Sequence, residues 1–175
     1  ADRADDLELI EICGAMLPAQ FRLLDHRGFR VNTYFMGAKE RECWRQGRAD
    51  FTSVHLSQVD RWCRETAPAD VAFLEVSTPD EEGYMSFGAS GVALHTYVRQ
   101  AAKRTILQIN ANVPYVFGEE NRIHISQADA VVCGNTPLME DPGLAFSDTI
   151  QTISSYIIDQ IPDGACIQLG LGGVS

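Results

Sequence analysis

The sequence lacks several features that would assign it to a class at once. No apolar run approaches the roughly 20 residues that a membrane-spanning helix requires. The stretch Ala1–Ile10 is acidic and has no apolar core of a signal peptide. Lys and Arg are scarce, 14 against 24 Asp and Glu, and the net charge of −10 argues against a nucleic-acid-binding surface. We therefore expect a cytoplasmic protein that binds neither membranes nor nucleic acids.

Paired cysteines are also missing. The five cysteines are widely and irregularly spaced, without a C-x-x-C pair, and the four histidines are equally scattered. This spacing favours reduced thiols over a disulfide framework, and it gives no support for a metal site. The cysteines are Cys13, Cys43, Cys63, Cys133 and Cys166.

The chain does contain alternating strand-like and helix-like segments. Its 175 residues, 45% of them hydrophobic, are enough for one domain with a core. Strands that alternate with helices every thirty or so residues predict an α/β fold, with an open, mainly parallel sheet and flanking helices. We predict a single domain over residues 1–175, with a minor boundary near 67–68.

The spacing of apolar residues predicts where individual strands and helices lie. Near-continuous apolar character predicts that the strand at 71–77 is buried on both faces. Ser147 is the expected N-cap of the most regular helix. Strands are predicted at 29–35, 51–56, 71–77, 84–87, 105–110, 123–125, 130–133 and 166–169. Helices are predicted at 5–17, 38–46, 58–65, 90–102 and 147–161.

Polar residues lie where the predicted strands end, which is where open α/β sheets bind ligands. Glu75 is either a sheet-edge carboxylate, solvated or paired, or a partly desolvated functional group. Gln108 and Asn110 either tie a loop to a strand or contact a ligand. The polar residues at the first two strand ends are Glu75, Ser77, Asp80, Gln108, Asn110 and Asn112. Among the histidines, only His124, between two isoleucines, is expected to be buried.

A glycine loop follows the apolar run 166–169. It fits neither the G-x-G-x-x-G dinucleotide pattern nor a P-loop. Taken alone, it could be a structural turn, or its backbone N–H groups could bind a phosphate or an oxyanion. The loop residues are Gly170, Leu171, Gly172, Gly173 and Val174.

Several blocks of the sequence carry a recognisable combination of residues, namely 47–52, 70–80, 83–88, 108–110 with 113–114, 123–126, 137–138 and 163–174. Taken together, these blocks resemble the acetyl-CoA hydrolase/transferase family, especially its 4-hydroxybutyrate CoA-transferase branch. Their order and spacing are similar to the family over nearly the whole chain from Gly47 onward. The resemblance implies an N-terminal CoA-transferase domain.

The resemblance also implies a mechanism. Family members move CoA from an acyl-CoA, such as acetyl-CoA or 4-hydroxybutyryl-CoA, to a small carboxylate through a glutamyl-CoA intermediate. Gly170 to Val174 match the family segment that contacts CoA, with the Val174 main-chain N–H as an oxyanion donor. The nucleophilic glutamate is expected beyond Ser175, in a C-terminal half, so this chain alone should be inactive.

Other readings stay open. An acetyl-CoA hydrolase of the same family would use water in place of the acceptor acid. A phosphate- or nucleotide-binding α/β module without catalysis would use the glycine loop alone. The resemblance implies CoA thioester as substrate, no tightly bound cofactor, no metal and a homo-oligomer. It leaves the acyl group and the roles of Glu75, Gln108 and Asn110 undecided.

Overall fold

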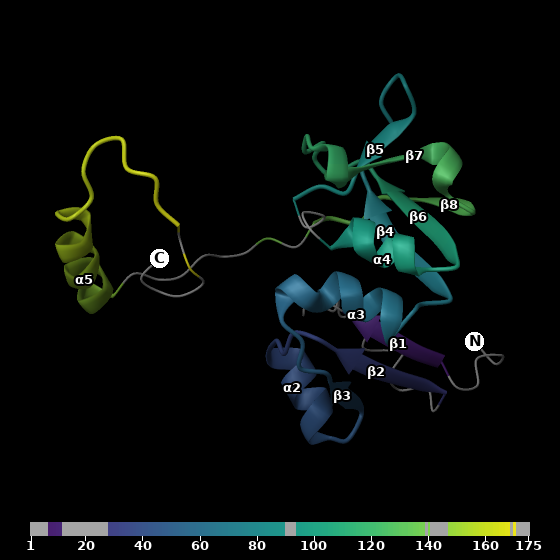
Figure 1. The fold of residues 1–175 in the computed structure, drawn as a ribbon, viewed down its shortest axis with the longest axis horizontal. Helices are drawn as coiled ribbons and strands as arrows, with labels where there is room; N and C mark the ends of the chain where they lie inside the picture. Colours follow the sequence, from purple (N-terminus) through teal and green to yellow (C-terminus); the bar gives the residue numbers. More distant parts are fainter. Residues whose placement is uncertain are drawn as a thin grey trace. The chain divides into compact units, whose positions relative to one another are not determined.

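The computed structural model describes residues 7–11, 28–89, 94–138, 140, 147–168 and 170. The chain divides into two compact units, Ala1–Thr136 and Pro137–Ser175. The first unit contains three small sheets and the helices that pack on them (Figure 1). Along the described part of the chain, no helix has both the length and the apolar character that crossing a bilayer requires.

The first sheet has three parallel strands in the order β1-β2-β3. The strands are β1 (Leu7–Glu11), β2 (Phe29–Thr33) and β3 (Ala49–Phe51), and helix α2 (Ala38–Arg45) lies between β2 and β3 in the chain. The helix predicted at 5–17 is wrong over Leu7–Glu11, because this stretch pairs with β2 along its whole length. Residues 5–6 and 12–17 of that prediction lie outside the described residues.

The second sheet is also parallel, in the order β4-β6-β8, with β6 in the centre. Its strands are β4 (Val71–Val76), β6 (Arg104–Asn110) and β8 (Ala130–Gly134). A third, antiparallel pair consists of β5 (Tyr84–Ser86) and β7 (Arg122–His124). Short 3-10 turns lie at Leu56–Gln58, Glu119–Asn121 and Ile125–Gln127. The predicted α/β class is therefore confirmed, with two separate parallel sheets in place of one.

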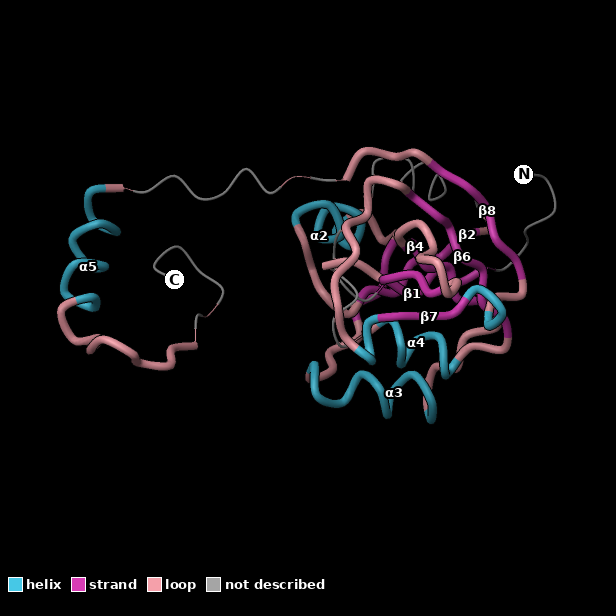
Figure 2. Tube along the Cα trace, turned by 90° about the horizontal axis from the view of Figure 1, so that it is seen from above, coloured by secondary structure: helices cyan, strands magenta, loops and turns pink. Residues whose placement is uncertain are grey.

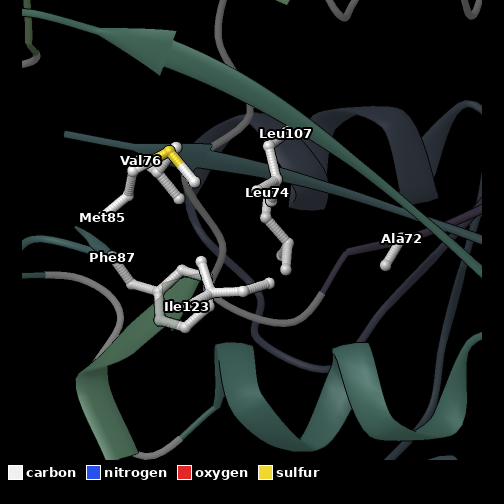
Figure 3. Close-up of a cluster of buried hydrophobic side chains, with 7 residues drawn as sticks. All are labelled: Ala72, Leu74, Val76, Met85, Phe87, Leu107 and Ile123. Atoms are coloured by element: carbon white, nitrogen blue, oxygen red, sulfur yellow. The ribbon is translucent and has the colours of Figure 1, made fainter. Parts of the chain in front are cut away.

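The main core lies on one face of the second sheet. Alternate residues of β4 and β6 pack there against β5 and β7 (Figure 3). The other face of β4 carries Phe73, which is 72% exposed, so the prediction of burial on both faces is wrong. Strand side chains alternate between faces, and the described core covers only one of them. The core residues are Ala72, Leu74, Val76, Met85, Phe87, Leu107 and Ile123.

Two helices pack together beside this sheet. Helices α3 (Val59–Glu65) and α4 (His95–Ala101) are in contact (Figure 2). Val59, Cys63 and Leu94 form the small core between them. Residues 90–93 of the helix predicted at 90–102 lie outside the described residues.

The second unit contains helix α5 (Asp148–Ile158). As predicted, Ser147 is its N-cap, and the Ser147 Oγ accepts a hydrogen bond of 3.3 Å from the Ile150 N–H. None of its residues is buried within the unit. The strand predicted at 166–169 is absent over its described residues 166–168, because no neighbouring strand in the described part of this unit offers a ladder.

Candidate functional site

A group of polar side chains gathers at the carboxyl end of the second sheet. We call it the carboxyl-end cluster, and it consists of Glu75, Gln108, Asn110, Asn112, Asn135 and Thr136. The parallel register pairs Glu75 with Gln108 on the next strand. Because side chains two positions apart share a face, Asn110 lies on the same side as Gln108. The fold thus assembles the cluster from three strand ends that are distant in sequence.

Glu75 is the acceptor at the base of the cluster. Its Oε1 accepts a hydrogen bond from Gln108 Nε2 at 3.0 Å and another from Asn110 Nδ2 at 2.8 Å. The residue is half-buried on the edge strand β4. Of the two interpretations of Glu75, the structure therefore supports the paired carboxylate at a sheet edge.

Asn110 is the centre of the cluster. It is 0% exposed, and its Nδ2 also donates to the Thr136 carbonyl at 2.7 Å. Its Oδ1 accepts from both the backbone N–H and the side-chain Nδ2 of Asn112, each at 3.1 Å. One buried amide thus joins β4, the loop after β6 and the segment after β8. This is the loop-tying role that the sequence left open for Asn110.

Gln108 depends on a glycine in the neighbouring strand. A Cβ added at Gly134 would lie 3.0 Å from Gln108 Nε2 and 3.1 Å from its Cδ. These separations are shorter than ordinary van der Waals contact, so a side chain at 134 would displace Gln108. Gly134 therefore leaves the space through which Gln108 reaches Glu75.

Two other residues predicted at strand ends lie outside the cluster. Ser77 is buried, and its Oγ donates to the Thr78 carbonyl and accepts from the Ser86 N–H. Asp80 closes the turn between β4 and β5. The backbone N–H of Tyr84, aided by the Tyr115 hydroxyl, holds the pKa of Asp80 below its ordinary value. Both residues stabilise the loop that leads to β5.

Hydrogen bonds from two buried side chains hold the loop that follows β6. Ser86 Oγ donates to the Val116 carbonyl at 2.9 Å and accepts from the Val116 N–H at 3.0 Å. Asn121 Nδ2 donates to the carbonyls of Val116 and Gly88. Because Ser86 and Asn121 are both buried, their hydrogen bonds hold the loop that carries Asn112 in place.

Sequence reasoning missed Asn135 and Thr136. Asn112 Nδ2 donates to Asn135 Oδ1 at 2.9 Å and to the Thr136 carbonyl at 3.1 Å. A signal was present, because both residues follow Gly134 at the end of the strand predicted at 130–133. The carboxyl end of that strand lies at the same edge of a parallel sheet as the other strand ends.

Two further predictions have different outcomes. His124 is half-buried, not buried, and its Nδ1 lies 2.7 Å from Ser126 Oγ. In the glycine loop, Gly170 is exposed, whereas Leu171, Gly172, Gly173 and Val174 lie outside the described residues. The described part of the chain contains no group of three His, Cys, Asp or Glu that could hold a metal.

The described cysteines differ in exposure. Cys43 and Cys63 are buried, whereas Cys133 and Cys166 are exposed. Burial raises the pKa of the Cys63 thiol, and the nearby Asp60 carboxylate acts in the same direction. Cys63 is therefore a core residue of the contact between α3 and α4, with the thiol form favoured.

The fold and this site define an α/β domain whose polar residues meet at the carboxyl end of a parallel sheet. The family model described as acetyl-CoA hydrolase/transferase N-terminal domain matches residues 2–140. The chain therefore belongs to the acetyl-CoA hydrolase/transferase family.

Two known proteins and one solved structure show how far the similarity extends. A butyryl-CoA:acetate CoA-transferase of Anaerostipes caccae is 33% identical, over 99% of the chain and 41% of the relative. A 4-hydroxybutyrate coenzyme A transferase of Clostridium kluyveri is 36% identical, over 85% of the chain and 34% of the relative. The crystal structure of RipA from Yersinia pestis has a TM-score of 0.86 at 29% identity, covering 97% of the chain and 41% of RipA. The chain thus spans less than half the length of these proteins.

Proposed function

We propose that the chain is the N-terminal part of an enzyme that transfers CoA between an acyl-CoA and a small carboxylate. The observation that carries this proposal is the family match over residues 2–140. Its relatives from Anaerostipes caccae and Clostridium kluyveri are both named as CoA-transferases. The polar carboxyl end of the second sheet gives the site where open α/β sheets bind ligands. The acetyl-CoA and 4-hydroxybutyrate pair is the proposed substrate class.

The proposed chemistry is covalent. A glutamate carboxylate outside residues 1–175 attacks the thioester carbonyl, the C–S bond breaks, and CoA leaves as a thiolate while the acyl group and the glutamate form a mixed anhydride. The thiolate then attacks the glutamyl carbonyl, releasing the donor carboxylate and forming glutamyl-CoA. An acceptor carboxylate reverses these two steps. The oxyanions that form need fixed donors, and we assign one to the Val174 N–H.

The proposal gives the rest of the glycine loop a binding role. Gly170, Leu171, Gly172 and Gly173 would contact CoA, because the three glycines have no side chain and allow the ligand to approach the backbone closely. The reaction moves CoA between two acids, so CoA is a substrate and no resident cofactor or metal is required. A C-terminal half and a homo-oligomer complete the proposed assembly, and residues 1–175 alone are expected to be inactive.

Hydrolysis is the second candidate, because the family description names both hydrolase and transferase. Water would then attack the activated acyl group in place of the acceptor acid. The two activities differ only in whether the site excludes water.

An exchange assay tests the proposal. Acetyl-CoA is incubated with isotopically labelled acetate, with residues 1–175 alone and with the longer natural polypeptide that contains them. We expect label in acetyl-CoA with the longer polypeptide only. Free CoA without exchange would indicate the hydrolase. Exchange by residues 1–175 alone would contradict a nucleophile outside the chain, and Glu75→Gln would then be the first variant to test.

A further inference from the structure

Two exposed asparagines form the rim of the carboxyl-end cluster. Asn112 follows β6 and Asn135 follows β8, and both side chains are exposed. A single hydrogen bond of 2.9 Å, from Asn112 Nδ2 to Asn135 Oδ1, joins them. The rim therefore lies at the carboxyl edge of a parallel sheet, where a ligand has access.

The direction of the hydrogen bonds inside the cluster sets the polarity of this rim. The carboxylate of Glu75 can only accept, so Gln108 and Asn110 must turn their N–H groups toward it. The Asn110 Oδ1 then faces Asn112 and accepts from its Nδ2. Asn112 Nδ2 has two more acceptors, the Thr136 carbonyl and Asn135 Oδ1. Glu75 and the Thr136 carbonyl, both acceptors, thus fix the orientation of a chain of amides that ends at the surface.

Two polar atoms of the rim remain available. In the part of the chain that the structure describes, Asn112 Oδ1 and Asn135 Nδ2 have no hydrogen-bond partner. The first is an acceptor and the second a donor. A ligand with amide groups supplies the matching N–H and C=O. A free carboxylate has no N–H to donate and would meet both the Asn112 carbonyl and the charge of Glu75.

We propose that Asn112 and Asn135 bind amide groups of the pantetheine arm of CoA, with Glu75 and Asn110 as positioning residues. This inference rests on the proposed function and assigns part of its ligand to named residues. Each neutral hydrogen bond lost to an arm of this kind weakens binding by roughly three- to tenfold.

The test is calorimetric binding to the full natural polypeptide. Three probes are used: CoA, pantetheine, which has the amides without the nucleotide, and 3′,5′-ADP, which has the nucleotide without the amides. We expect Asn135→Ala to weaken CoA and pantetheine binding by about tenfold and to change 3′,5′-ADP binding by less than twofold. Gln100→Ala, an exposed change on α4, is the matched control and should bind all three as the wild type does.

A second variant distinguishes direct binding of CoA by Asn135 from a role limited to holding Asn112 in place. Asn135→Asp keeps an oxygen that accepts from Asn112 but replaces the donor Nδ2 with another acceptor. We expect it to lose CoA affinity at least as much as Asn135→Ala. If Asn135→Asp bound CoA normally, Asn135 would only support Asn112 and the inference would be wrong.

The other outcomes are also decisive. Equal loss of 3′,5′-ADP binding would mean that the rim contacts the nucleotide or that the fold is damaged, and it would overturn the inference. Wild-type CoA binding that neither variant changes would overturn the inference and leave the proposed function standing. Absence of wild-type CoA binding together with absence of acetate exchange would overturn both.

Discussion

The two parallel sheets of the first unit have the same strand number and direction but end differently. At the carboxyl end of the first sheet, Phe35 and Phe51 are exposed, and a side-chain hydrogen bond of 2.9 Å joins Asn32 to Thr52. At the carboxyl end of the second sheet, a connected cluster surrounds the buried Asn110. Identical topology therefore does not decide which sheet end can bind a polar ligand, because the side chains at the last strand positions do.

The cores of the two sheets differ as well. Among the described residues, seven buried side chains form the core of the second sheet, whereas Val31, Cys43 and Ala49 form that of the first. We therefore expect changes in the second sheet to cost more free energy of unfolding than matched changes in the first.

Core truncation should show the largest contrast. Val76→Ala removes two methyl groups of a 0% exposed side chain from the second core, and we expect it to lower the free energy of unfolding by about 3 kcal/mol. Val31→Ala removes the same atoms from the smaller core of the first sheet and should cost roughly 2 kcal/mol. Urea unfolding measures both. Equal costs would contradict the ranking of the two cores.

Removal of the central amide is the next contrast. Asn110→Ala removes one hydrogen bond from Glu75, one from the Thr136 carbonyl and two from Asn112, and should cost about 2–3 kcal/mol. Thr52→Val removes the hydrogen bond between Asn32 and Thr52 in the first sheet and should cost about 1 kcal/mol or less. A larger loss of unfolding free energy from Thr52→Val than from Asn110→Ala would contradict the claim that the hydrogen bonds of the carboxyl-end cluster contribute more stability than those at the end of the first sheet.

A smaller effect is expected beside the first sheet. Trp62 Nε1 donates to the Tyr34 hydroxyl at 2.7 Å. Burial raises the pKa of Tyr34, and this hydrogen bond partly offsets the rise. Trp62→Phe should therefore raise the Tyr34 pKa further and cost roughly 1–2 kcal/mol. Ultraviolet titration of the phenol measures the shift, and an unchanged or lower pKa would contradict this account.

The smallest effect concerns acid stability of the turn between β4 and β5. The Tyr84 N–H, first among several donors, lowers the pKa of Asp80 in the folded state. A carboxylate whose pKa is lowered by folding stabilises the fold at pH values above the pKa it has in the unfolded chain. This stabilisation is lost as the pH falls through the pKa of the folded state. Asp80→Asn should therefore show a shallower loss of stability below about pH 4 than the wild type. Urea midpoints at pH 6, 4 and 3 provide the test, and parallel curves would refute it.

Long apolar strands and the regular helix could be predicted from the sequence. The runs at 71–77, 105–110 and 130–133 correspond to β4, β6 and β8, and Ser147 caps α5. Local pattern was sufficient there because a short apolar run bounded by turn residues indicates a strand, and regular apolar spacing indicates a helix. Leu7–Glu11 was mistaken for part of a helix because its partner strand lies some twenty residues away, and only the pairing reveals it.

The site was predictable in part. Glu75, Gln108, Asn110 and Asn112 could be named because they stand at strand ends. Their mutual contacts depend on the register of three strands, which no local pattern contains. The space that Gly134 leaves for Gln108, and the role of Asn135, follow only from that register.

The most direct test of the central claim is hydrogen exchange of the full natural polypeptide with and without CoA. If the carboxyl end of the second sheet binds the ligand, CoA should slow amide exchange in residues 110–116 and 134–136. Exchange in 33–35 and 51–53, at the end of the first sheet, should change less. Protection confined to the first sheet would contradict the account.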